Sequence, residues 1–146
     1  MLDEELMPPI RGAGVTLILW GENLDSAEVS RLLGVKATSS NRRGEQRKGS
    51  TVVSRDGRWL RTLPDLSPGN LSEQVTEVFA GLSNDAAVWS YLAMQYHIEL
   101  MCYLYPNNEP EQFALTVDTL SLLATRRAAI RFIHFGFDDE VGNGKS

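Results

Sequence analysis

The chain has 146 residues, a net charge of −5 and an apolar fraction of 42%. These values are typical of one globular domain with its own core, and they argue against long-range attraction of nucleic acid. The single cysteine, Cys102, excludes an internal disulfide and is typical of a reducing compartment. Because the N-terminus is acidic and no long apolar run occurs, we expect neither a signal peptide nor a membrane helix. We therefore expect one cytoplasmic domain, ordered over about 12–138, with flexible tails at 1–11 and 138–146.

The first half of the chain predicts a strand, a helix and a hairpin. Residues 13–20 are apolar at both alternating sets of positions, which is typical of a central strand covered on both faces. A helix over 25–34 has Asp25 as its N-cap and a glycine as its stop. Residues 37–49 are polar and without periodicity, which favours a surface loop, and residues 51–63 predict a hairpin around an Asp-Gly turn.

The second half alternates helices with strands. Apolar side chains at helical spacing predict a helix over 70–82, whereas AVWSYL at 87–92 favours a strand. That strand is expected to turn back and pair with a longer strand over 96–105. A helix capped by Thr116 and a closing strand over 129–137 complete the order.

The strand over 96–105 is the cleanest alternation in the chain. One face carries Ile98, Leu100, Cys102 and Leu104, and the other carries His97, Glu99, Met101, Tyr103 and Tyr105. We expect the first face to lie in the core, which makes Cys102 a small hydrophobe rather than a nucleophile. The aromatic face is covered by another element or exposed to a partner, and the sequence leaves both options open.

This order of elements predicts an α+β fold. We expect a single mixed or mainly antiparallel sheet of about five to six strands, with three helices packed mainly on one face.

The chain resembles the bacterial domain-of-unknown-function family 4279 over about residues 13–137. The resemblance lies in the helix ending Leu32-Leu33-Gly34, the strand with Trp59, the IELMCYLYP strand, and the T-x-D-x-L-x-x-L-A helix from Thr116. It implies a small α+β domain without an assigned activity, and it implies no site residues.

Motifs for catalysis or cofactor binding are weak. The C-terminal GNGKS lacks the first glycine of a phosphate-binding loop and has no helix after it. His97, Glu99 and His134 could form a metal site or a small pocket if their strands are neighbours. Half-buried histidines with polar neighbours are the simpler interpretation. We therefore predict no cofactor, no metal and no catalytic residue.

Positive charge is concentrated between residues 31 and 61, which carry +7, whereas the remainder carries −12. A basic loop beside a tryptophan is typical of a surface that grips phosphates and stacks a base. The residues concerned are Arg42, Arg43, Arg47, Lys48, Arg58 and Trp59. The loop could equally dock on an acidic protein, or only balance its own acidic domain.

Three hypotheses follow. The leading one is a non-enzymatic interaction domain that binds a protein or a second copy of itself through Tyr103, Tyr105 and the Arg-rich loop. The second is nucleic-acid binding by the loop and the Trp59 hairpin. The third is an enzyme or small-ligand binder near His97 and His134. Membrane binding is not expected.

Overall fold

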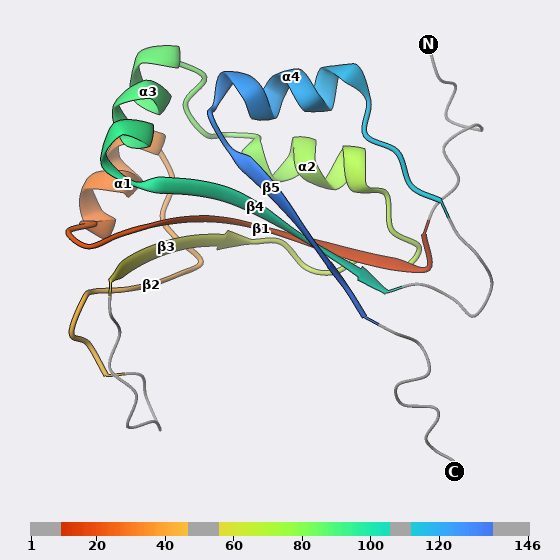
Figure 1. The fold of residues 1–146 in the computed structure, drawn as a ribbon, viewed down its shortest axis with the longest axis horizontal. Coiled ribbons are helices and arrows are strands. Elements are labelled where there is room, and N and C mark those ends of the chain that lie inside the picture. The colour runs from red at the N-terminus through yellow and green to blue at the C-terminus, as the bar shows by residue number, and fades with distance from the viewer. Residues whose placement is uncertain (1–9, 47–55, 106–111, 136–146) are drawn as a thin grey trace.

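The computed structural model describes residues 10–46, 56–105 and 112–135. These residues form five strands and four helices, in an α+β arrangement (Figure 1). In chain order the elements are β1 (Gly12–Gly21), α1 (Ser26–Leu33), β2 (Ser39–Asn41), β3 (Gly57–Thr62), α2 (Leu71–Phe79), α3 (Ala86–Gln95), β4 (His97–Tyr105), α4 (Val117–Thr125) and β5 (Ala129–His134).

The strands form one mixed sheet in the order β2-β3-β1-β4-β5. All neighbours are antiparallel except β4 and β5, which run parallel and are joined through α4. Figure 1 shows the described helices together on one side of the sheet. The sheet therefore has a helix-covered face, and an opposite face on which the described residues place no helix.

The central position of β1 explains why its sequence is apolar throughout. Val15, Leu17 and Leu19 point into the core below the helices and are at most 1% exposed. Thr16 and Ile18 point to the opposite face, yet they are only 4% and 8% exposed. On this face Ile18 lies between Leu60 of β3 and Glu99 of β4, and the Thr16 hydroxyl hydrogen bonds that of Thr62 at 3.1 Å.

The helices begin where the sequence places capping side chains. Asp25, Asn70 and Thr116 each accept a hydrogen bond from a backbone N–H in the first turn of α1, α2 and α4. Gly34 follows α1 in the left-handed conformation, with φ of 87°, which a residue with a Cβ adopts only with strain. These three predicted helices are confirmed.

The strand predicted over 87–92 is wrong, because these residues lie inside the helix α3. The reason is that apolar residues surround this helix, so the sequence has no stripe of helical period, and Val, Trp and Tyr raise its strand propensity. The helix begins after Asp85, whose carboxylate accepts the Ala87 N–H at 2.9 Å. The domain consequently has four described helices rather than three, and β4 pairs with β1 instead of with this segment.

The surface loop predicted over 37–49 contains a short strand, β2, which pairs with β3 at the edge of the sheet. The first arm of the predicted hairpin, 51–54, lies outside the described residues, and the second arm is β3. Ile10, predicted to belong to the N-terminal tail, is 3% exposed and pairs with Gly69. Ile10 therefore belongs to the core.

The inward face of β4 is confirmed as core. Leu100 and Cys102 are fully buried beneath the helices, and Ile98 and Leu104 are nearly so. Burial raises the pKa of the Cys102 thiol to about 12. The thiol is therefore protonated at neutral pH and packs as an apolar side chain, as the alternation predicted.

Candidate interaction surface

The strand β5 lies at the edge of the sheet and presents backbone groups outward. The Phe135 N–H donates to the Leu104 carbonyl at 3.0 Å, so odd-numbered residues of β5 turn their backbone groups toward β4. Because successive residues of a strand alternate, the N–H and C=O groups of Ile130, Phe132 and His134 point away from the sheet. Among the described residues, none pairs with these outward groups.

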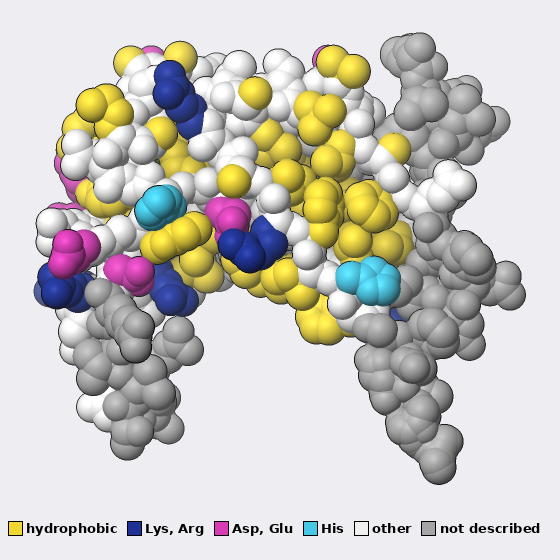
Figure 2. All heavy atoms as spheres, viewed as in Figure 1, with side chains coloured by type: hydrophobic (Ala, Val, Ile, Leu, Met, Phe, Trp, Pro, Cys, Tyr) yellow, Lys and Arg dark blue, Asp and Glu magenta, His cyan; other side chains and the backbone are white. Residues whose placement is uncertain are grey.

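Exposed apolar side chains gather beside this edge. Eight large hydrophobic side chains of the described residues are exposed, and five of them belong to β5, α4 or their flanking residues. Figure 2 shows hydrophobic side chains clustered beside α4 and β5. We call these five residues the β5 surface: Phe113, Val117, Leu120, Phe132 and Phe135, exposed by 41–80%.

An aromatic cluster extends this surface onto the face without helices. The Phe135 ring stacks on Tyr105, with centroids 4.9 Å apart and planes within 5°, and lies 6.4 Å from the Tyr103 ring. Both tyrosines are half-buried. Partial burial, together with the nearby Asp65 carboxylate, raises the pKa of Tyr105. On the helix side, Phe132 contacts Phe113 at 5.3 Å between centroids. Aromatic side chains thus flank the β5 backbone on both sides.

The charged residue within β5 is already paired. The Arg131 guanidinium donates two hydrogen bonds to the Glu99 carboxylate of β4, at 3.0 and 3.1 Å. Such a two-point pair holds the Arg131 side chain against its own sheet. Edge strands are commonly protected from pairing by an outward charge or a proline. The described strand β5 contains no proline, and its arginine is bound to Glu99.

The basic region lies at the opposite edge of the sheet, beside β2 and β3. Arg43 forms a salt bridge with Glu22 at 2.8 Å, and the Arg58 Nε lies 3.4 Å from the Asp56 carboxylate. Arg42 is exposed, whereas Arg47 and Lys48 lie outside the described residues. Four strand spacings, about 19 Å, separate this edge from β5. The described arginines of the loop, Arg42 and Arg43, therefore lie beyond β3 and β1 from Tyr103 and Tyr105, which belong to β4.

Trp59 is placed in the core rather than on the surface. Its side chain is 0% exposed, and the indole Nε1 donates to the Ser30 hydroxyl of α1 at 3.0 Å. A buried indole has no face available to stack on a base, so the combination of Trp59 with the Arg-rich loop is not formed.

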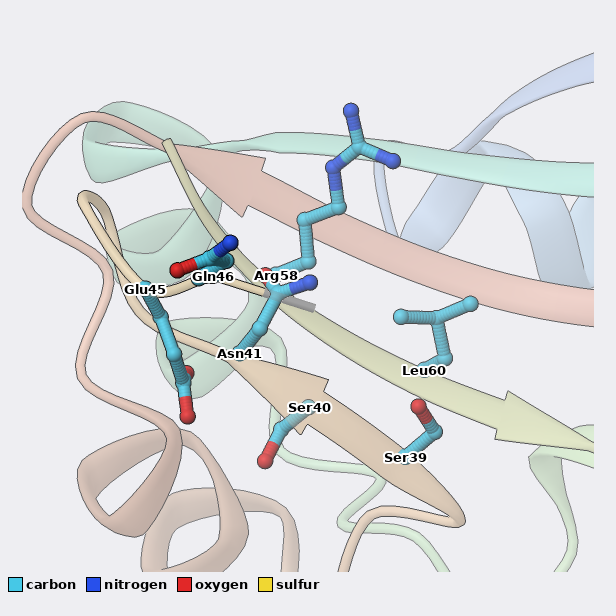
Figure 3. Close-up of a pocket in the computed structure, with 7 residues that line it drawn as sticks. All are labelled: Ser39, Ser40, Asn41, Glu45, Gln46, Arg58 and Leu60. Atoms are coloured by element: carbon cyan, nitrogen blue, oxygen red, sulfur yellow. The ribbon is translucent and has the colours of Figure 1, made fainter. Parts of the chain in front are cut away.

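The polar pocket at the β2 edge has a volume of about 460 Å³. Figure 3 shows its lining residues, which are Ser39, Ser40, Asn41, Glu45, Gln46, Arg58 and Leu60. The buried Asn41 Oδ1 has no hydrogen-bond partner in the described structure. The Glu45 carboxylate accepts the Arg42 N–H at 2.7 Å and so closes the turn beside the pocket.

The two histidines do not form a site together. His97 lies opposite Trp20 at the start of β4 and stacks on its ring at 5.1 Å, whereas His134 lies beside Leu104. The seven residue steps from position 97 to position 104 of β4 span about 23 Å. The hypothesis of a pocket shared by His97 and His134 is therefore wrong. Within the described ranges, no cluster of three metal-ligating side chains is found.

The sequence did not identify Phe113, Val117, Leu120, Phe132 and Phe135 as surface residues. Phe132 and Phe135 fall on opposite faces of the predicted closing strand, and apolar residues on both faces are equally typical of a buried strand. Only the strand order shows that β5 is an edge, and the sequence did not establish that order.

The described residues form an α+β domain with one open mixed sheet and helices on one side. The chain belongs to the family described as "Domain of unknown function (DUF4279)", whose model matches residues 10–134. The resemblance seen in the sequence is thereby confirmed. No curated protein and no solved structure matches the chain. None of the described helices has the length and apolar character needed to cross a bilayer.

Proposed function

We propose that this protein is a non-enzymatic, cytoplasmic interaction domain, which binds an extended segment of a protein partner along β5. The observation that supports this proposal is the edge of β5, which no other described strand pairs with and which exposed aromatic side chains flank. An added strand gains main-chain hydrogen bonds from the outward groups of Ile130, Phe132 and His134. The flanking apolar side chains supply burial and select the partner.

The amount of exposed apolar surface also favours binding. Single exposed hydrophobic residues are normal, but a contiguous group usually marks an interaction site. Phe113 and Phe132 are in direct contact, and Phe135 continues the group across the strand onto Tyr105. Aromatic residues are also enriched in the buried centres of protein interfaces.

The test is a comparison of bound proteins between variants. Tagged protein is incubated in extract that contains a second, differently tagged copy of the chain, and the retained proteins are identified. We expect retained proteins, the second copy included, to be lost with Leu120→Glu plus Phe132→Lys. They should persist with Met94→Glu, which alters a side chain 81% exposed on α3, outside the β5 surface. If both variants retain the same proteins as the wild type, the β5 surface is not the binding surface.

A further inference from the structure

We propose that the strand bound by β5 is the β5 strand of a second copy of this chain. The two strands run antiparallel, with Phe132 opposite Phe132 of the second copy. This inference rests on the proposed function, because it names the partner of the same edge. The antiparallel pairing of the two β5 strands would join the sheets of two copies into one continuous sheet across a symmetric interface.

Symmetry restricts how two identical edges can meet. A closed dimer has a two-fold axis, and such an axis relates neighbouring strands only when they are antiparallel. One residue of each strand then lies directly opposite itself. Since β5 spans Ala129–His134, the residues nearest its middle are Arg131 and Phe132.

Side-chain chemistry selects Phe132 over Arg131 as this central residue. With Arg131 at the axis, two guanidinium groups would lie directly opposite one another, and like charges in that position are destabilising. With Phe132 at the axis, two aromatic rings meet, and Arg131 lies across from Ile133 of the second copy. Phe132 is 41% exposed, so its ring still has surface to bury.

The backbone also favours this register. The outward N–H and C=O groups belong to Ile130, Phe132 and His134. When Phe132 faces its copy, Ile130 faces His134 of the second copy, so each outward-facing residue of β5 meets another outward-facing residue. With Arg131 at the axis, His134 would instead face residue 128, which precedes the strand.

Charges at the two ends of β5 are complementary to an antiparallel copy. Arg127 precedes the strand and is exposed, whereas the neighbouring Arg126 lies over the rings of Phe79 and Trp89 in the core. In the sequence, Asp138, Asp139 and Glu140 follow the strand. In the sequence, basic residues thus precede β5 and acidic residues follow it, and this order of charge favours an antiparallel copy over a parallel one.

The mass of the purified protein tests the dimer. Light scattering over a range of concentrations should approach twice the chain mass of 16.2 kDa. Phe132→Lys should return the mass to that of one chain, because a lysine on an edge strand opposes pairing. Met94→Lys adds the same charge outside the β5 surface and should remain a dimer. Circular dichroism verifies that both variants fold. A single-chain mass for the wild type at every concentration overturns the inference.

Cysteine crosslinking tests the register. Phe132→Cys should form a disulfide-linked dimer on mild oxidation, because residues in opposite positions bring their Cα atoms within disulfide range. Arg131→Cys and the wild type should remain uncrosslinked, since Cys102 is fully buried. Crosslinking through position 131 but not 132 overturns the proposed register. If the wild type has a single-chain mass but another protein is captured through the β5 surface, the proposed function stands and this inference fails.

Discussion

The two edges of the sheet are built in opposite ways. The β2 edge is three residues long and polar, its side chains are Ser39, Ser40 and Asn41, and a tight turn closed by Glu45 lies beside it. The β5 edge is six residues long and mostly apolar, and its one arginine is held by Glu99. Short polar edges resist pairing, whereas long apolar edges invite it. The comparison indicates that a partner strand would add at β5 and not at β2.

The largest expected difference between the two edges comes from removing one aromatic side chain beside each. Trp59→Ala should lower the free energy of unfolding by about 3–5 kcal/mol, because it empties a fully buried site behind β2 and β3 and leaves the Ser30 hydroxyl without its donor. Urea denaturation measures this effect.

The matched variant is Phe132→Ala at the β5 edge. At protein concentrations low enough for a single chain, its free energy of unfolding should fall by only about 1 kcal/mol or less, since the ring is partly exposed. A loss as large as that of Trp59→Ala would show that Phe132 is a core residue and remove the contrast between the edges.

Replacing Arg61, which connects β3 to the end of α2 by hydrogen bonds, should lower the stability by a smaller amount. Its guanidinium donates to the carbonyls of Val78 and Ala80 at the end of α2, at 2.8 and 3.3 Å. An arginine satisfies carbonyls that lack a partner at a helix end. Arg61→Met should therefore lower the free energy of unfolding by about 1–2 kcal/mol in urea denaturation. Arg42→Met, with an exposed side chain, should be nearly neutral.

The smallest expected effect is a pH dependence of the free energy of unfolding, which arises from Cys102 on β4. Cys102 lies beside Phe132 in the β4–β5 register, and burial raises its pKa from 9.0 to about 12. Above pH 9 the unfolded chain loses this proton while the folded chain retains it, so stability is complete below pH 9 and falls as pH rises toward 12. The free energy of unfolding should drop by about 1 kcal/mol between pH 8 and pH 10.

Cys102→Val is the control for this pH dependence, because it keeps an apolar side chain of similar size and removes the titrating group. The free energy of unfolding of this variant, measured by denaturation at each pH, should change less between pH 8 and pH 10 than that of the wild type. Equal slopes for the variant and the wild type would assign the pH dependence to other groups, of which Tyr96 and Tyr91 beside Glu28 also have raised pKa values.

Local signals in the sequence were sufficient for much of the fold. Capping side chains predicted α1 and α4, apolar residues at helical spacing predicted α2, and alternation predicted the buried face of β4. Prediction failed at α3, where apolar residues on all sides remove the helical period. The short strand β2 was missed because its stability comes from pairing with β3 and not from its own Ser-Ser-Asn sequence.

The candidate site was harder to predict than the fold, because it depends on strand order. Tyr103 and Tyr105 were expected to meet a partner or a covering element, and the structure shows them half-buried beside Phe135. Trp59 and Arg58 are adjacent in sequence but point to opposite faces of the sheet, one into the core and one to the uncovered side. Adjacency in sequence therefore did not produce a joint surface, which is the expected result of strand geometry.

The placement of the helices on one side of the sheet has a consequence for how a dimer would engage a larger target. Because the axis relating two antiparallel β5 strands stands perpendicular to the sheet, the helices of both copies lie on the same side. Both uncovered faces then point in the other direction. A target with two matching epitopes would meet them simultaneously, and the second contact would benefit from high effective concentration. Weak contacts at each face could then add up to firm, avid attachment.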